Sequence, residues 1–205
     1  MFDRTAHWEG VYASRGESEV SWFQENPAIS LELIKQTHAA PESAIIDIGG
    51  GASRLVDALL RDGYRAVTVL DLSATALEQA RKRIGPESAK ADWIVADVTK
   101  WKPERQYQVW HDRAAFHFLT DPDDRRAYLD CLRSALAPAG QAIIGTFALD
   151  GPERCSGLPA QRYDSKGLAE QLGASFELAE TRSEMHRTPW NSSQAFQFSR
   201  FHRRG

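Results

Sequence analysis

Length and charge exclude several classes of protein. The chain has 205 residues, enough to bury a substantial core, and no Pro-, Gly- or Ser-rich linker divides it, so we expect one domain over 1–205. Its 25 Lys and Arg residues nearly balance 28 Asp and Glu residues, which gives a net charge of -3. That balance supplies no electrostatic reason to bind nucleic acid or an anionic membrane. We expect a small molecule or a local protein surface as the partner.

The sequence shows no signals for membrane insertion, secretion or metal binding. No apolar run approaches the roughly 20 residues that cross a bilayer, and "MFDRTAHWEG" has neither the basic nor the apolar part of a signal peptide. We therefore expect a cytoplasmic protein. Cys131 and Cys155 form neither a disulfide framework nor a zinc signature, so no metal site is expected. The composition leaves the oligomeric state open.

Strand-like and helix-like segments alternate through the middle of the chain. Runs rich in Val and Ile, of strand length, lie at 44–49, 66–72, 92–98, 107–113 and 142–148. Helical patterns separate them at 53–61, 74–84 and 123–135, and Gly63 and Gly85 are placed to end the first two. This alternation predicts a parallel sheet with helices on both faces, because a parallel crossover must span the sheet.

The two ends of the chain depart from this alternation. Residues 1–39 are interpreted as a helical lid, followed by a core over 40–148. In the last part, 149–205, a helix near 165–171 precedes two longer strands at 176–187 and 195–203. We expect these strands to form an antiparallel pair at one sheet edge. The predicted fold is therefore α/β, with a doubly wound, mostly parallel seven-stranded sheet.

Three successive glycines follow the first strand in "AIIDIGGGASRLVDALL". An isolated glycine turn of this kind is as often purely structural as it is ligand-binding. Here, however, Asp71 ends the next strand 20 residues after Gly51, which suits a carboxylate that accepts hydrogen bonds from a ribose diol. Arg54 stands where a dinucleotide-binding turn needs a further glycine. The pattern therefore favours a nucleoside cofactor without a pyrophosphate.

These residues resemble a known family. Asp47-x-Gly49-x-Gly51, the acidic end of "VLDLS" and Asp97 in "VADVT" are similar to the first three motifs of class I S-adenosylmethionine-dependent methyltransferases, in order and spacing. The N-terminal "HWEGVYASRGESEVSWF" resembles the start of the methyltransferase-like group that contains the translation elongation factor lysine methyltransferases. The resemblance covers about 44–147 and implies a Rossmann-like fold and the cofactor S-adenosyl-L-methionine.

The resemblance also implies roles at the methionine end of the cofactor. Trp8 and Tyr12 would close over this end. The glycine turn would let its carboxyl and amino groups approach the backbone, and the residues concerned are Gly49, Gly50 and Gly51. Arg113, after the fourth strand, would contact the cofactor through its main chain.

A second set of positions would hold the adenosine. Asp71 would bind the ribose hydroxyls, with Leu72 packed against adenine. Asp97 would accept from the adenine amino group, and the Val98 backbone amide would donate to a ring nitrogen. None of these motifs identifies the methyl acceptor.

The fourth strand ends in "WHDRAAFHFL", without the "N-P-P-Y" or "D-P-P-Y" tetrapeptide of enzymes that methylate nucleobase amino groups or glutamine amides. We therefore do not expect such acceptors. His111 and Asp112 are candidates for a base or for orienting the acceptor. Only some of these side chains can face the substrate, since alternate strand residues point to opposite sides. His117 is a candidate for acceptor contact or, alternatively, a core histidine.

The loop "GPERCSGLPAQRY" is expected to reach the same edge of the sheet, and it carries Cys155, Arg162 and Tyr163 as further candidates for acceptor binding. An ordinary surface loop is the alternative. His186 and Trp190, in the turn of the last strand pair, are interpreted as an edge feature. The predicted activity is methyl transfer by in-line displacement to a small-molecule or protein-lysine acceptor. The alternative function is a non-catalytic, cofactor-binding subunit that scaffolds or activates a partner.

Overall fold

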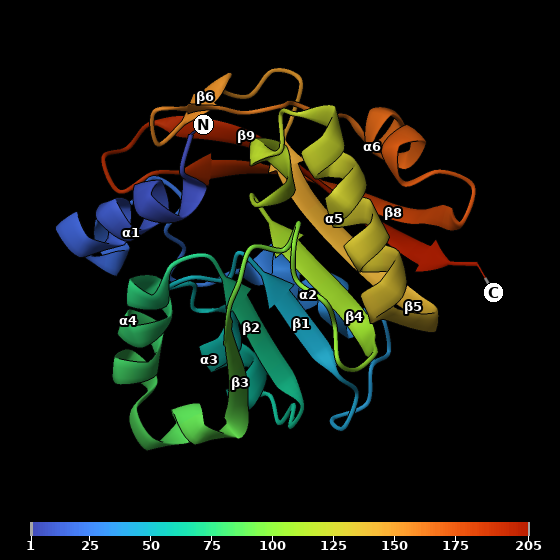
Figure 1. Ribbon diagram of the computed structural model, residues 1–205, viewed down its shortest axis with the longest axis horizontal. Coiled ribbons are helices and arrows are strands. Elements are labelled where there is room, and N and C mark those ends of the chain that lie inside the picture. Colours follow the sequence, from blue (N-terminus) through green and yellow to red (C-terminus); the bar gives the residue numbers. More distant parts are fainter. Residues whose placement is uncertain (1, 205) are drawn as a thin grey trace.

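Seven strands form one sheet in the computed structural model, which describes residues 2–204 (Figure 1). They lie in the order β3-β2-β1-β4-β5-β9-β8; neighbours among the first five run parallel, and β9 is antiparallel to β5 and β8. The bounds are β1 Ile45–Ile48, β2 Val67–Asp71, β3 Ala91–Val95, β4 Tyr107–Arg113, β5 Leu136–Phe147, β8 Phe176–Arg187 and β9 Ser193–Arg203. The predicted fold class is confirmed.

Helices cover both faces of the sheet. Apolar side chains of α2, α3 and α4 form one core with β1 and β2, and those of α5 and α6 form a second core with β1, β4 and β5. The bounds are α1 Arg4–Ser14, α2 Ala28–Lys35, α3 Leu55–Arg61, α4 Ala74–Ile84, α5 Pro122–Ala135 and α6 Ser165–Leu172. Within residues 2–204, no helix is long and apolar enough to cross a membrane.

Strand β1 carries both cores. All four of its residues are buried; Ile46 and Ile48 belong to one core and Ile45 to the other. Because side chains alternate along a strand, Asp47 lies on the same face as Ile45, and it is 3% exposed. A carboxylate buried this deeply needs hydrogen-bond partners, so Asp47 marks the carboxyl end of β1 as a polar site within an apolar layer.

Short polar side chains fix where helices begin. The Ser73 hydroxyl accepts from the Ala76 amide at 3.1 Å and starts α4, and Asp3 accepts from the Ala6 amide at 3.0 Å and starts α1. Helix α4 spans the residues predicted for it and ends, as expected, at Gly85, where φ is +68°. The Ser73 cap lies two residues after the end of β2, so it ties the start of α4 to the sheet edge.

Two regions differ most from those that the sequence suggests. Strand β5 begins at Leu136 rather than near 142, because Leu136 already pairs with Tyr107 before the register shifts. The Pro and Gly inside this stretch obscure the strand pattern. In the predicted loop, β6 (Arg154–Cys155) and β7 (Leu158–Pro159) form a small antiparallel hairpin. This hairpin gives Cys155 a fixed place that a loose surface loop would not.

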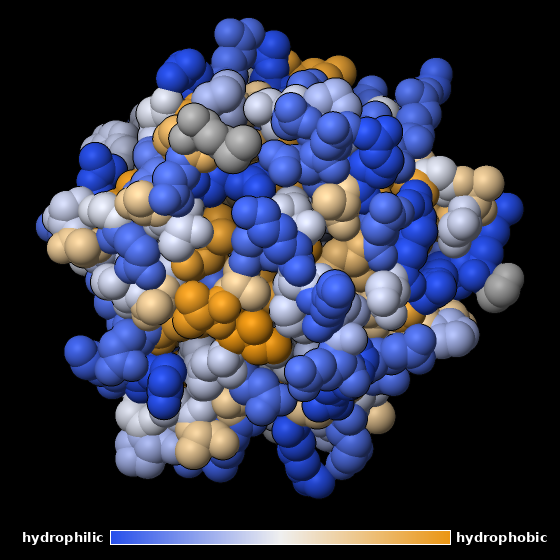
Figure 2. All heavy atoms as spheres, in the orientation of Figure 1, coloured by the Kyte–Doolittle hydropathy of each residue, from blue (hydrophilic) through white to orange (hydrophobic). Residues whose placement is uncertain are grey.

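The N-terminal segment interpreted as a lid contains two helices in different surroundings. Helix α1 packs beside α4 at the edge where the parallel strands end (Figure 1). Helix α2, in contrast, is part of the core, since Leu33 and Ile34 are fully buried against the sheet. The face seen in Figure 2 is mostly hydrophilic, with apolar side chains gathered near its middle. The covering part of the segment is therefore α1 and the chain leading to α2.

The tightest point of the turn after β1 is Gly50. A Cβ atom there would lie 2.6 Å from both the Asp47 Oδ2 and the Val69 Cγ1 atoms, which are buried. We expect Gly50→Ala to lower the free energy of unfolding by about 1–3 kcal/mol through overpacking. Chemical denaturation measures this. Gly10→Ala is the matched control, because a Cβ there meets nothing within 4 Å; it should be neutral or stabilising by up to about 1 kcal/mol. Equal effects of the two substitutions would contradict this account of the turn.

Candidate active site

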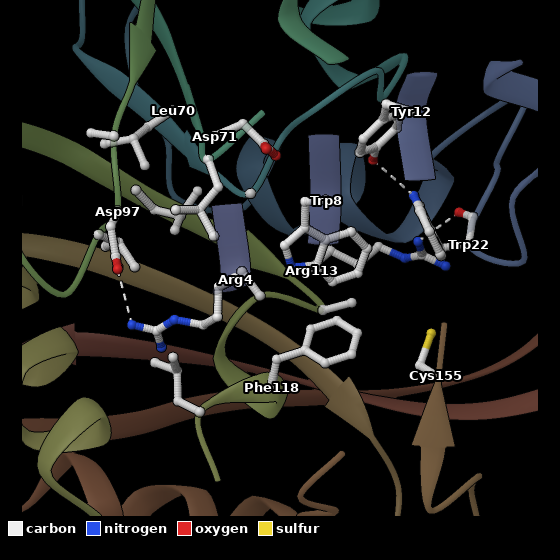
Figure 3. A pocket seen from close by; sticks show the side chains of 18 of the residues that line it. Arg4, Trp8, Tyr12, Trp22, Leu70, Asp71, Asp97, Arg113, Phe118 and Cys155 are labelled. Atoms are coloured by element: carbon white, nitrogen blue, oxygen red, sulfur yellow. Dashed lines mark hydrogen bonds and ion pairs between the residues drawn. The ribbon is translucent and has the colours of Figure 1, made fainter. Parts of the chain in front are cut away.

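A deep cavity lies at the carboxyl ends of the parallel strands, beneath α1 (Figure 3). It encloses about 830 Å³ including its open mouth. Its walls come from separate parts of the chain, namely α1, the strand ends, the turn after β4, the β6 hairpin and β9. The predicted residues that line it are Trp8, Tyr12, Gly49, Asp71, Leu72, Asp97, Val98, Arg113 and Cys155. Residues predicted for both cofactor and acceptor thus share one cavity.

Two carboxylates lie at one end of the cavity. Asp71, at the end of β2, is 8% exposed and accepts from the Ser73 amide at 2.8 Å. Burial, with Asp47 nearby, raises the pKa of Asp71 to about 7. Asp97 is also desolvated by burial, but hydrogen bonds from Thr99 and the charge of Arg4 outweigh this and lower its pKa. The cavity therefore contains one carboxylate that titrates near neutrality and one that stays ionised.

Arg4 was not predicted as a site residue. Its Nη2 atom donates to Asp97 Oδ2 at 2.9 Å, and its Nη1 atom donates to Asp124 Oδ2 at 3.0 Å. Figure 3 shows the side chain reaching across the cavity toward Asp97. Arg4 thereby ties the start of α1 to the turn after β3 and to the start of α5. No motif in the sequence marks it, because its partners are about 90 and 120 residues away.

Aromatic side chains fill the middle of the cavity wall. The Trp8 ring packs edge-on against Trp22 and Phe118, with centroid distances of 5.5 and 5.0 Å. The Tyr12 hydroxyl accepts from Trp22 Nε1 at 3.2 Å, and burial, reinforced by the charge of Asp71, raises the pKa of Tyr12. Tyr12 is therefore neutral at physiological pH. Phe118 is a wall residue that the sequence did not reveal.

The three glycines of the turn have different neighbours. Gly49 lines the cavity with φ of +66°, and a Cβ there would meet the Ala115 Cβ at 2.7 Å. Gly51, with φ of +47°, leaves space for the Tyr12 hydroxyl and the Asp71 carboxylate. Gly50 borders an adjoining hollow rather than this cavity. Packing within the protein thus accounts for much of the glycine requirement, and Gly49 alone of the three contributes to the cavity wall.

His111 and Asp112 do not line the cavity. His111 is 2% exposed, with Nδ1 2.7 Å from Asp47 Oδ1 and Nε2 2.9 Å from the Ser30 hydroxyl, and it borders the adjoining hollow. Asp112 is completely buried on the opposite face of β4, where it accepts from the Tyr128 hydroxyl at 2.7 Å and from two backbone amides. Burial raises the pKa of Asp112 to about 6, although these hydrogen bonds oppose it. The structure brings neither side chain to the aromatic wall.

Of the residues predicted for acceptor binding, only one lines the cavity. Cys155 lines the cavity, and burial raises the pKa of its thiol. His117 is fully buried behind the wall; its pKa falls to about 3, chiefly through burial, so it is neutral. Arg162 pairs with Glu153 outside the cavity, and Tyr163 packs against the core ring of Phe116.

The other end of the cavity is formed by Arg113, Cys155, Gln194 and Phe196. The guanidinium of Arg113 lies 4.6 Å from the centroid of the Phe196 ring, and its Nη1 atom donates to the Trp22 carbonyl at 2.9 Å. Gln194 and Phe196 come from β9, which follows β5 only after a long excursion of the chain. Their period-2 pattern in the sequence marks a strand, but nothing local indicates a site.

Comparisons with known proteins agree with this geometry. A family model described as a methyltransferase domain matches residues 45–140. The eEF1A lysine and N-terminal methyltransferase of Mus musculus is 26% identical over 127 residues, which is 60% of this chain and 18% of that protein. The chain therefore spans about a fifth of the length of this relative.

Solved structures share the fold over nearly the whole chain. A SAM-dependent methyltransferase from Anabaena variabilis has a TM-score of 0.78 at 16% identity, covering 100% of this chain and 96% of that one. The N-methyltransferase NodS from Bradyrhizobium japonicum, in complex with S-adenosyl-L-homocysteine, has a TM-score of 0.74 at 16% identity, covering 98% and 99%. Residues 45–140 thus match a methyltransferase domain, and the chain as a whole has the fold of class I S-adenosylmethionine-dependent methyltransferases. This confirms the family resemblance and the cofactor that it implied.

The residues that line the cavity also fit this cofactor, independently of the comparisons. A buried carboxylate at the end of β2, a second one after β3 and apolar contacts from Leu72 and Val98 match a nucleoside with hydroxyl and amino donors. The missing side chain at Gly49 leaves the backbone open to close approach. The cavity also extends along the aromatic rings to Cys155.

Asp112 provides a test of the buried hydrogen bonds beneath the site. Asp112→Ala leaves the Tyr128 hydroxyl and two buried amides without their acceptor. We expect the free energy of unfolding to fall by about 2–4 kcal/mol, measured by urea denaturation. Asp150→Ala, at an exposed aspartate, is the control and should change it by less than about 0.5 kcal/mol. A fully stable Asp112→Ala protein would refute the structural role assigned to this carboxylate.

Proposed function

We propose that this protein transfers a methyl group to an acceptor held between the aromatic wall and Cys155. The observation that carries the proposal is the division of one cavity into two chemically distinct ends. One end has the carboxylates Asp71 and Asp97; the other is enclosed by rings, a thiol and a buried guanidinium (Figure 3). When bound, S-adenosylmethionine supplies an electrophilic methyl group on a sulfonium. Transfer of this methyl group requires the acceptor atom to lie in line with the breaking carbon–sulfur bond.

The adenosine end is assigned residue by residue. Asp71 accepts from the ribose hydroxyls, and Leu72 packs against the base. Asp97 accepts from the adenine amino group, with the Val98 amide donating to a ring nitrogen. Since Arg4 already binds one oxygen of Asp97, its side chain either shares this carboxylate or moves when the base binds. If the carboxylate is shared, the Arg4 contact also holds α1 over the occupied cavity.

The methionine end lies by the glycine turn. Gly49 lets the amino-acid part approach the backbone, Trp8 and Tyr12 cover it, and the Arg113 main chain borders it. We assign His111 a positioning role: its hydrogen bonds to Asp47 and Ser30 hold the carboxylate that packs against the turn. The reaction does not require any of these side chains to act as a base, because an amine that binds in its neutral form is already nucleophilic.

We favour methyl transfer to a small-molecule acceptor, because α1 and the aromatic wall cover the cavity and leave it only partly open. A protein lysine is the second candidate. The mouse relative is described as a lysine and N-terminal methyltransferase, and a lysine side chain is narrow enough to pass between aromatic rings. Both candidates place the acceptor at the Cys155 end.

The raised pKa of Asp71 makes cofactor binding depend on pH. Ribose hydroxyls donate to the ionised carboxylate, so binding favours the deprotonated form. With a pKa of about 7 in the free protein, affinity for S-adenosylhomocysteine should rise about tenfold from pH 6 to pH 8. Asp71→Asn cannot titrate; it should bind about 1–3 kcal/mol more weakly at pH 8 and show no such rise. Calorimetry at the two pH values checks both statements, and a wild-type affinity independent of pH would contradict the assignment.

Methyl transfer itself is tested with labelled cofactor. The protein is incubated with methyl-labelled S-adenosylmethionine and a cell lysate of its source, which is then separated into protein and small-molecule fractions. We expect label in the small-molecule fraction; label in a protein band supports the lysine candidate instead. Cofactor binding without transfer to either fraction would contradict the proposal and favour a non-catalytic subunit.

A further inference from the structure

The Arg113 end of the cavity has a chemistry of its own. Figure 3 shows Arg113 and Cys155 on the opposite side of Trp8 from Asp97. The Arg113 side chain has no role in the proposed binding of adenosine by Asp71 and Asp97. A guanidinium here is costly, because removal of a charge from water must be offset by partners.

The guanidinium is only partly satisfied. Its side chain is 11% exposed, and it makes one hydrogen bond, from Nη1 to the Trp22 carbonyl at 2.9 Å. Both Nε and Nη2 are buried without a hydrogen-bond partner among residues 2–204. The planar fork of arginine places such donors side by side, which is the arrangement that a carboxylate accepts.

Neighbouring charges limit what this end can bind. The Glu184 Oε2 atom lies 3.7 Å from Arg113 Nη2, too far for a hydrogen bond, while its Oε1 atom accepts from Gln24 at 2.6 Å. Burial lowers the pKa of His186, which bonds the Ser21 carbonyl through Nε2, so it adds no positive charge at neutral pH. One cation beside one carboxylate favours a ligand with a single negative charge over a doubly charged phosphate.

A hydrogen-bond acceptor and apolar walls complete this end. Gln194 is 9% exposed and lines the cavity, and its Oε1 atom has no donor within the described chain. It can accept from an N–H or O–H of a ligand. The surrounding rings of Trp22, Phe118 and Phe196 suit a flat or apolar body.

We propose that the methyl acceptor is a small aromatic or similarly apolar acid, with its carboxylate on Arg113 and an amino or hydroxyl group on Gln194. The inference rests on the proposed function and names its substrate class. In the transfer, the nitrogen or oxygen of that group bonds to the methyl carbon while the carbon–sulfur bond breaks. The electron pair of that bond remains on sulfur, which becomes neutral, and the methylated group releases its proton to water.

The first test separates acids from other acceptors. The low-molecular-mass fraction of a lysate is divided by anion exchange before reaction, and each part, as well as the protein fraction of the same lysate, is incubated with the enzyme and labelled S-adenosylmethionine. We expect label in the part that the anion exchanger retains. Label confined to the unretained part or to protein overturns the inference while leaving methyl transfer intact. Failure to label any fraction, protein included, contradicts the proposed function and this inference with it.

A matched pair of probes tests the charge on the wild-type protein. Phenylacetate and its neutral amide, phenylacetamide, have nearly the same shape. As inhibitors of labelling in the retained fraction, phenylacetate should act at concentrations at least about tenfold lower. Equal inhibition by the two overturns the role of the carboxylate. This comparison does not depend on whether any variant folds.

Variants of Arg113 test the residue. Arg113→Met should raise KM for the retained fraction at least about tenfold, and Arg113→Lys, which keeps the charge, should recover part of the loss. Both should bind S-adenosylhomocysteine within about threefold of wild type. A tenfold loss of that affinity would mean that the guanidinium holds the cofactor's own carboxylate, and it overturns the inference. Arg126→Met, on the exposed face of α5 beside Asp123, is the control and should change neither quantity.

Discussion

The close approach of the β1 carboxyl end to the turn after it is the constraint on which the site depends. Asp47 is buried among apolar side chains, and its carboxylate lies against the backbone of Gly50 while His111 binds its other oxygen. This arrangement requires a residue without a side chain at position 50. On either side of it, Gly49 borders the cavity and Gly51 leaves room for the Tyr12 hydroxyl. The turn that carries the cavity wall is therefore packed directly against one buried carboxylate.

Burial controls the chemistry of the polar groups around this turn. Asp71 and Asp112 are both desolvated and both have a raised pKa, yet their surroundings give them different roles. Asp112 has its oxygens filled by Tyr128 and backbone donors, so it stabilises the turn after β4. Asp71, in contrast, lines the cavity, with its Oδ2 atom beside Gly51. The same physical effect thus yields a structural group in one place and a group open to a ligand in the other.

Helix α1 connects the two ends of the cavity. Arg4 pairs with Asp97 at the adenosine end, whereas Trp8 contacts both Trp22 and Phe118 near the acceptor end. Because these contacts lie one helical turn apart, a movement of α1 would alter both ends together. With the adenosine bound at Asp97 as proposed, cofactor binding and closure of α1 over the acceptor are expected to be coupled.

Much of the fold could be predicted from the sequence, and so could many of the residues that line the cavity, because both depend on local patterns. Strand-length apolar runs, the glycine turn and Asp71 at the end of the second strand are contiguous features, and comparison with known proteins confirms the fold and the family resemblance. Other residues of the cavity wall come from chain segments that meet only in the folded protein. Arg4, Phe118 and Gln194 carry no motif.

The orientation of side chains at the end of β4 could not be predicted from the sequence either. Whether His111, Asp112 or Arg113 faces the cavity depends on the phase of the strand and on the turn that follows it. His111 and Asp112 lie on opposite faces, each with protein partners, and Arg113 alone of the three reaches the cavity. Residue type alone therefore does not show which of the three side chains lies at the cavity.

The most direct measurement is a crystal structure of the protein with S-adenosylhomocysteine. The account predicts ribose hydroxyls within hydrogen-bond distance of the Asp71 carboxylate, the base beside Leu72 and Val98, and the sulfur directed toward the space between Phe118 and Cys155. A cofactor bound elsewhere, or one whose sulfur points away from the Cys155 end, would contradict the division of the cavity on which the proposed function rests.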